Sequence, residues 1–161
     1  MKKMNFLIRL KNEEKLSLIE PSEEIKESYF EKSESNLSSA KILLKNDKLE
    51  EAVALTYYSM YNLVIALLFK VGIKSENHTA SIILLDELFG IDNSDIKYAK
   101  KERIDKQYYT DFNIKKEEVI EAIGVAENFN SDLFDFVSRL NMNDVGRLRE
   151  KFNNLLLSFE L

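Results

Sequence analysis

The sequence of 161 residues contains no cysteine and only one histidine, His78. The absence of cysteine excludes disulfide bonds, iron–sulfur clusters and zinc sites built on thiolates. One histidine cannot form a multi-histidine site within a single chain, and we expect no bound metal and no cofactor. The chain also has only four glycines and one proline. So few helix-breaking residues disfavour a turn-rich β protein and favour a small number of long helices.

The sequence shows neither the pattern of a signal peptide nor that of a membrane span. The sequence begins with a basic pair, but the apolar stretch that follows, Phe6 to Ile8, is too short for a signal peptide. No stretch approaches the roughly 18 uninterrupted apolar residues of a membrane span. The formal net charge is -5, whereas a protein that coats nucleic acid would be basic. We therefore expect a soluble cytoplasmic protein in which any nucleic-acid contact uses a local basic patch.

Apolar residues recur at helical spacing along most of the chain and predict an all-α protein. Residues 1–20 form a lead-in that can be a strand, a helix or an arm, and residues 74–77 are expected to be a loop. The predicted fold is one domain, residues 1–161, built as an antiparallel bundle of four to five long helices. The expected helices span residues 22–46, 49–71, 78–89, 96–109 and about 113–136, with a C-terminal helix within 138–161.

The segment 49–71 is apolar on nearly all sides, which predicts a helix at the centre of the bundle. Its length would also suit a membrane anchor, but the tyrosine hydroxyl groups within it would need partners in lipid. Three polar residues, Ser22, Asp47 and Asn113, are predicted to cap the starts of helices. Gly72 is predicted to end the central helix.

The central helix and the chain after it carry a set of residues in a recognisable order. Paired tyrosines and a further aromatic residue come first, then a glycine, a serine and a histidine, then an arginine, a polar residue and a tyrosine. An alanine and a phenylalanine on an apolar helix come last. These residues are Tyr57, Tyr58, Tyr61, Gly72, Ser75, His78, Arg103, Gln107, Tyr108, Ala126 and Phe129. In order and spacing, the chain from about residue 22 to residue 137 resembles the small stand-alone HEPN proteins of bacteria and archaea, which are bundles of long helices.

Many HEPN proteins are metal-independent ribonucleases, and the resemblance implies a site in which four to six residues separate an arginine from the histidine that follows it. The arginine stabilises charge on the phosphate, and the histidine moves protons on the ribose oxygens. Here Arg103 is followed at those distances by Tyr108, Tyr109 and Thr110. Tyrosine has an ordinary pKa of about 10 and is a poor base at neutral pH. The catalytic candidates are therefore Arg103, Tyr108 and His78, and the sequence leaves the distance from His78 to Arg103 open.

A basic stretch surrounds Arg103 and contains only two acidic residues, Glu102 and Asp105. Cations interleaved with aromatic rings suit contacts with RNA or with nucleotide phosphates. The alternative is that these charges form an ordinary solvated helix face. The residues expected to bind RNA or a nucleotide are Lys97, Lys100, Lys101, Arg103, Lys106 and Tyr109.

The departure from the family motif predicts a HEPN protein with a degenerate ribonuclease motif that is the partner of a separately encoded nucleotidyltransferase, in a toxin–antitoxin-like or nucleotide- or RNA-binding system. Some HEPN toxins are adenylylated by that partner on a tyrosine, at the position where this chain has Thr110. Two alternatives stay open: an active metal-independent ribonuclease toxin and a non-catalytic helical module. Because small HEPN bundles usually pair through long helices and the segment 49–71 is so apolar, we expect a homodimer in each case.

Overall fold

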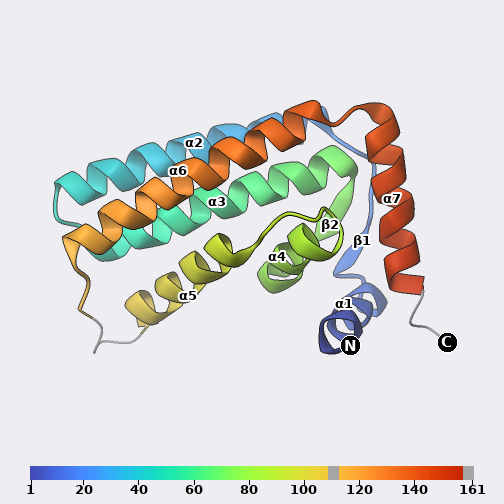
Figure 1. The fold of residues 1–161 in the computed structure, drawn as a ribbon, viewed down its shortest axis with the longest axis horizontal. Helices are drawn as coiled ribbons and strands as arrows, with labels where there is room; N and C mark the ends of the chain where they lie inside the picture. Colours follow the sequence, from blue (N-terminus) through green and yellow to red (C-terminus); the bar gives the residue numbers. More distant parts are fainter. Residues whose placement is uncertain (109–112, 158–161) are drawn as a thin grey trace.

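The computed structural model describes residues 1–108 and 113–157, with side chains up to residue 106 in the first range. The elements are α1 (Lys2–Asn12), β1 (Leu16–Leu18), α2 (Glu23–Lys45), α3 (Leu49–Val71), β2 (Ile73–Ser75), α4 (His78–Glu87), α5 (Ser94–Tyr108), α6 (Lys116–Arg139) and α7 (Met142–Leu157). The helices α2, α3 and α6 run side by side, α4 and α5 lie along one side of α3, and α1 and α7 close one end (Figure 1). The predicted all-α bundle of long helices is confirmed.

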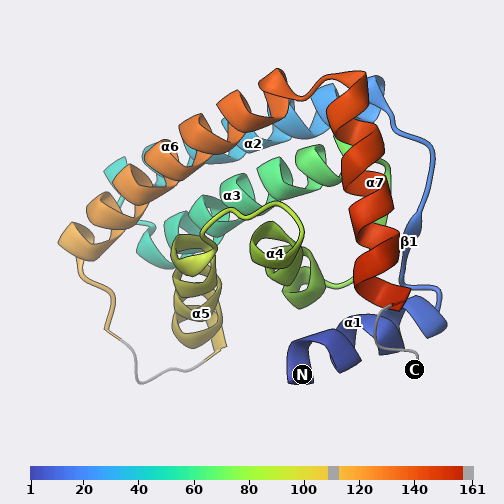
Figure 2. The ribbon, with the colours of Figure 1, turned by 45° about the vertical axis from the view of Figure 1, so that its right-hand side comes forward.

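The central position predicted for residues 49–71 is also confirmed. The helices α2, α5 and α6 pack against α3, and the side chains of Tyr57, Val64 and Leu67 on α3 have no exposed surface. Figure 2 shows α3 between the pair α2 and α6 and the pair α4 and α5. By length and composition α3 would suffice to span a membrane, but 72% of its apolar window is buried inside the protein. This extent of burial is typical of a helix in the core of a bundle.

Ser22 begins α2 and Gly72 ends α3, as predicted. The Oγ atom of Ser22 accepts a hydrogen bond from the backbone N–H of Ile25 at 3.2 Å. Gly72 has a φ of 80°, a left-handed conformation that favours glycine. A Cβ atom on Gly72 would lie 2.4 Å from the carbonyl oxygen of Ile19. A side chain at this position would therefore push apart α3 and the N-terminal segment.

The capping predictions for Asp47 and Asn113 are wrong. The residue that precedes α3 is Lys48 and the residue that precedes α6 is Lys115, and neither helix start has a side-chain cap. Asp47 instead adopts a positive φ of 55° in the turn between α2 and α3. A short polar side chain tolerates this conformation, so the residue serves the tight turn rather than the helix start.

The lead-in segment contains both a helix, α1, and a short strand, β1. The strand β1 pairs with β2 in an antiparallel manner, with Leu16 opposite Ser75 and Leu18 opposite Ile73. Residues 74–77, predicted to be a loop, therefore include the end of a strand. The partner of β2 lies far away in the sequence, so local residue patterns do not reveal the pair. The strand leads directly to the start of α4, where the histidine lies.

Candidate functional site

Two buried tyrosines hold the single histidine of the chain. Tyr57 and Tyr61 lie one turn apart on α3 and contact His78, the first residue of α4. The hydroxyl oxygen of Tyr57 is 2.9 Å from Nδ1 of His78, and the Tyr61 ring stacks on the imidazole with 3.8 Å between the ring centroids. The side chain of Asn77 accepts a hydrogen bond from the backbone N–H of Ala80 at 3.0 Å and caps α4. The cap at Asn77 therefore fixes the backbone at His78, and the two tyrosines fix its imidazole ring.

Arg103 reaches the same tyrosines from α5. Its Cζ atom lies 5.1 Å from the ring centroid of Tyr57 and 5.4 Å from that of Tyr58. Its Nη1 atom donates a hydrogen bond to the Tyr58 hydroxyl at 3.2 Å. Tyr57 therefore contacts both His78 and Arg103. The structure brings together two of the three catalytic candidates, which lie on different helices.

Lys100 lies one helical turn before Arg103 and connects α5 to the start of α4. Its Nζ atom donates a hydrogen bond to Oγ1 of Thr79 at 2.6 Å. Thr79 is the second residue of α4, at the end of the helix where the helix dipole favours anions. The first turn of α4 contains no acidic residue. We refer to His78, Thr79, Lys100 and Arg103 as the cationic cluster.

The charges in the cationic cluster influence one another. Burial, together with the positive charges of Arg103 and Lys100, lowers the pKa of His78 below its ordinary value, so the imidazole is neutral at pH 7. Burial and the charge of Arg103 also lower the pKa of Lys100. Burial is the main cause that raises the pKa of Tyr57, and its phenol therefore keeps its proton. At neutral pH the cationic cluster contains two cations and one neutral imidazole, and the phenol of Tyr57 beside it is protonated.

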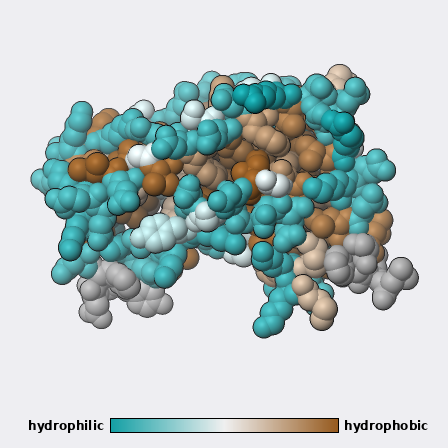
Figure 3. Space-filling model, in the orientation of Figure 1, coloured by the Kyte–Doolittle hydropathy of each residue, from teal (hydrophilic) through white to brown (hydrophobic). Residues whose placement is uncertain are grey.

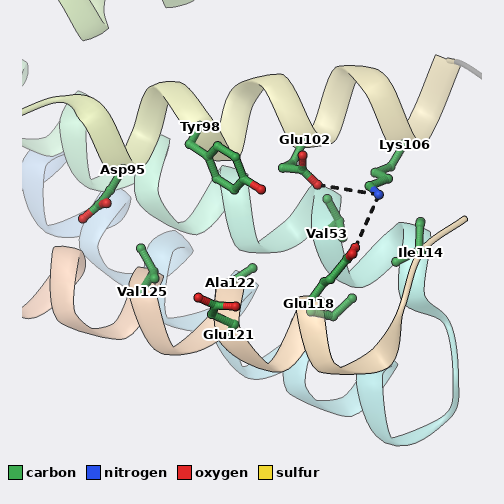
Figure 4. Close-up of a pocket in the computed structure, with 11 residues that line it drawn as sticks. Val53, Asp95, Tyr98, Glu102, Lys106, Ile114, Glu118, Glu121, Ala122 and Val125 are labelled. Atoms are coloured by element: carbon green, nitrogen blue, oxygen red, sulfur yellow. Dashed lines mark hydrogen bonds and ion pairs between the residues drawn. The ribbon is translucent and has the colours of Figure 1, made fainter. Parts of the chain in front are cut away.

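The side of α5 that faces α6 is different in character. Lys106, one of the predicted RNA-binding residues, forms ion pairs with Glu102 at 3.8 Å and with Glu118 at 3.4 Å. These residues line a cavity of about 490 Å³ between α5 and α6 (Figure 4). Figure 3 shows apolar side chains along this face of the molecule with hydrophilic side chains around them. Lys106 thus lies in a contact between helices where two carboxylates face its ammonium group, and it does not join the cationic cluster.

The other predicted site residues lie either on the exposed surface of α5 or outside the described residues. Lys97 and Lys101 are exposed on α5, where helical spacing places them near Lys100 on the surface. Tyr108 ends α5, but its side chain lies outside the described residues. Tyr109 and the residue after it also lie outside the described residues.

Sequence analysis did not single out Thr79 or a role for Tyr57 in the site. The four-residue spacing of Tyr57 and Tyr61 is a signal that they share one face of a helix. Nothing around Thr79 marks it, because its role depends on how α4 packs beside α5. Within residues 1–108 and 113–157, no group of three or more histidine, aspartate and glutamate side chains is arranged to hold a metal ion.

Comparison with known proteins places this geometry in a family. A model of the HEPN domain matches residues 26–135, about two thirds of the 161 residues. The chain belongs to the HEPN family. The match includes α3, α4 and α5, and with them the whole cationic cluster. HEPN domains are associated with functions related to nucleotides and RNA. A search of curated proteins finds no match to the chain.

The cationic cluster of this HEPN protein has the chemistry of an anion site with a base beside it. Guanidinium and ammonium groups donate several hydrogen bonds to phosphate oxygens. Lys100 and Arg103 supply these groups from α5, and Thr79 in the first turn of α4 adds a hydroxyl group. The neutral imidazole of His78 can accept a proton at pH 7.

Proposed function

We propose that this HEPN protein binds RNA or a nucleotide through a phosphate group held by the cationic cluster. The observation that carries the proposal is the meeting of Lys100, Arg103 and the start of α4 at one place. The ammonium group of Lys100 contacts the hydroxyl of Thr79 rather than a carboxylate. Gathering like charges is unfavourable; burial lowers the pKa of Lys100, and the charge of Arg103 lowers it further. A bound phosphate would relieve the repulsion between these charges.

The test measures the binding of a fluorescent single-stranded RNA oligonucleotide by anisotropy. Replacement of Lys100 by methionine removes a charged phosphate contact, and we expect the affinity to fall about tenfold. The slope of log affinity against log salt concentration should also fall by about 0.7 for each lost contact. Lys41→Met is the matched control, because it removes the same charge from an exposed ion pair with Glu127 on another face. Equal weakening by both variants would contradict the proposal.

A competition experiment separates the two ligand classes. Both RNA and a free nucleotide present phosphate groups, and ATP competes with the labelled RNA only if a nucleotide suffices to fill the site. Competition at ATP concentrations that leave the Lys100→Met variant unaffected would assign the site to nucleotides. Displacement by unlabelled RNA alone would assign it to RNA.

We also propose that the protein works in the cytoplasm as the partner of a separately encoded nucleotidyltransferase, in a toxin–antitoxin-like system. Membership of the HEPN family supports this proposal, as does the presence of Tyr108 where the family motif has histidine. Coexpression with a nucleotidyltransferase encoded beside this chain should give a complex that elutes as one species in size-exclusion chromatography. Separate elution of the two proteins at micromolar concentration would contradict the partnership.

Homodimerisation stays a prediction, but its surface is not α3, which is covered within one chain. The large apolar side chains exposed on the long outer helices are Ile25 and Ile42 on α2, exposed by 39% and 61%, and Ile120 and Phe134 on α6, exposed by 53% and 45%. We propose that a dimer buries this α2 and α6 surface. Light scattering should give twice the chain mass of 18.8 kDa, and Phe134→Glu should return the mass to that of one chain. A wild-type monomer at micromolar concentration would contradict the proposal.

The non-catalytic helical module remains the alternative to a ligand-binding site. It predicts that the wild type binds neither RNA nor a nucleotide, while the dimer is unaffected. The aromatic contacts of Arg103 would then serve only to fix α5 against α3.

A further inference from the structure

We propose that the cavity between α5 and α6 is a binding site for a linear aliphatic polyamine, of which spermidine is the type. The cavity lies on the other side of α5 from the cationic cluster, and its ligand has the opposite charge. The proposal therefore goes beyond the proposed function and needs neither RNA nor a nucleotide. The volume of about 490 Å³ is within the range of about 300–1,000 Å³ that is usual for sites of small molecules.

The charge of the lining is the first part of the argument. Among the described residues that line the cavity, four carry a carboxylate and one carries an ammonium group. The carboxylates are those of Asp95 and Glu102 on α5 and of Glu118 and Glu121 on α6, and the ammonium group is that of Lys106. Four negative charges against one positive charge leave the lining with a formal net charge of -3. A ligand with several positive charges would relieve the repulsion among the carboxylates.

The spacing of the carboxylates is the second part. Asp95 and Glu102 are seven residues apart on α5, which corresponds to about 10 Å along the helix axis. Figure 4 shows Asp95 at one end of the cavity, Glu102 and Glu118 at the other end, and Glu121 between them. The negative charge is therefore spread along an elongated site. A chain with ammonium groups at intervals matches this distribution, whereas a single metal ion is too small to reach both ends.

The apolar part of the lining is the third part. Val53 on α3 and Val119 on α6 are buried and line the cavity. The ring of Tyr98 also lines it and is 64% exposed. The methylene groups of a polyamine pack favourably on such surface, and an aromatic face attracts an ammonium group. A compact hydrated ion such as Mg²⁺ makes neither contact.

Lys106 shows how this cavity holds an ammonium group. Its side chain is 9% exposed, and its Nζ atom lies 3.8 Å from a carboxylate oxygen of Glu102 and 3.4 Å from one of Glu118. Both distances exceed the roughly 2.7–2.9 Å of a hydrogen bond between two charged groups. The two carboxylates therefore keep capacity for a closer cation, and an ammonium group of the ligand competes with Lys106 for them.

The test measures the binding of spermidine to the full-length protein, without RNA, by isothermal titration calorimetry. We expect saturable binding at one site in each chain. Glu121→Gln should weaken it by about fivefold, on the scale of one partly exposed ion pair. Glu117→Gln is the matched control, because it removes the same charge from the same helix at an exposed residue that does not line the cavity. Equal weakening by both variants would overturn the proposal, because binding would then follow the total charge of the protein.

Lys106→Met should act in the opposite direction. Removing the competing ammonium group should strengthen the binding of spermidine by about fivefold, a gain that misfolding does not produce. Lys116→Met removes the same charge from the ion pair with Asp47, outside the cavity, and should change the affinity by less than about twofold. An unchanged or weakened affinity in Lys106→Met would contradict a site that includes Glu102 and Glu118.

Two further measurements separate a shaped site from a negatively charged surface. Ala122→Phe fills part of the cavity without changing any charge and should abolish binding, while thermal unfolding followed by circular dichroism confirms that the fold is kept. Putrescine, a shorter diamine that does not reach both ends, should bind about tenfold more weakly than spermidine. Displacement of spermidine by an equal concentration of Mg²⁺, or no saturable binding to the wild type, would overturn the proposal. The binding of RNA at the cationic cluster would be unaffected by either result.

Discussion

The two sides of α5 hold their cations in opposite ways. On the side that faces α6, Lys106 is paired with the carboxylates of Glu102 and Glu118. On the side that faces α4, Lys100 contacts a hydroxyl group and Arg103 lies over aromatic rings. One helix therefore carries a lysine between two carboxylates on one side and a lysine and an arginine close together on the other.

The comparison teaches that the density of lysine and arginine in a sequence does not by itself define a binding site. A cation beside carboxylates has its field largely cancelled, whereas a cation held by hydroxyl groups and aromatic faces keeps its field for a ligand. Of the predicted binding residues on α5, this criterion selects Lys100, which contacts a hydroxyl group, and removes Lys106, which pairs with two carboxylates. The following experiments are designed to break or sharpen this distinction.

The largest effect is expected from the tyrosines on the two sides. Tyr57 has no exposed surface, whereas Tyr98 lines the cavity on the α6 side and is 64% exposed. Tyr57→Ala should lower the free energy of unfolding by about 3–5 kcal/mol, the usual cost of truncating a buried aromatic side chain. Tyr98→Ala should change it by at most about 0.5 kcal/mol. Urea unfolding followed by circular dichroism measures both, and equal effects would show that the cationic side has no tighter packing.

A second experiment places a carboxylate beside a lysine on the side of α5 that faces α4, as is found on the side that faces α6. Thr79→Glu places a carboxylate next to Lys100, and we expect RNA affinity to fall by about 10–100-fold through lost attraction and added repulsion. The same change should slightly stabilise the protein, by about 0.3–1 kcal/mol, because an acidic residue suits the first turn of a helix. Thr79→Gln is the neutral control and should keep most of the affinity. A fall in both affinity and stability in Thr79→Glu would indicate misfolding rather than charge cancellation.

The helices could be predicted from the sequence more fully than the spatial proximity of the site residues. The bounds of α3, Leu49–Val71, follow from a continuous apolar run that ends at a glycine. The start of α2 follows from the capping residue Ser22. Asp47 misled the prediction because a tight turn competed with the helix start for the same residue.

The site could be predicted only in parts. Arg103, Lys100 and His78 were each identifiable as residues with suitable chemistry. Their proximity depends on the packing of α4 and α5 against α3, which no local pattern encodes. The pairing of Lys106 with Glu118 is equally a consequence of tertiary packing, because the two residues lie on different helices. The sequence therefore indicated which residues have suitable chemistry, but not which of them come together in one site.

A third experiment uses pH to separate the two sides. The pKa of His78 is lower in the folded protein than its ordinary value of 6.5. At pH values between the folded and the unfolded pKa, the unfolded chain therefore binds more protons than the folded protein. The contribution to stability is therefore fully present above about pH 6.5 and is lost as the pH falls through the folded pKa. Between about pH 7.5 and about pH 5, the wild type should lose stability relative to His78→Gln in urea unfolding. Arg103→Met should raise the pKa of His78 measured by NMR, and Lys106→Met should leave it unchanged.

The smallest effect is expected for Lys106→Met. The Glu118 carboxylate that it pairs with is 48% exposed, so water can replace much of the lost contact, and the free energy of unfolding should fall by at most about 1 kcal/mol. Lys116→Met, which breaks an ion pair with an Asp47 side chain that is 76% exposed, is the matched control and should change stability even less. RNA affinity should stay within about twofold of the wild type in both variants, whereas Lys100→Met removes the same charge from the same helix as Lys106→Met and weakens binding about tenfold. Equal losses of affinity in Lys106→Met and Lys100→Met would mean that RNA responds to the total charge of α5. The different surroundings of the cations on the two sides of α5 would then matter for packing but not for RNA binding.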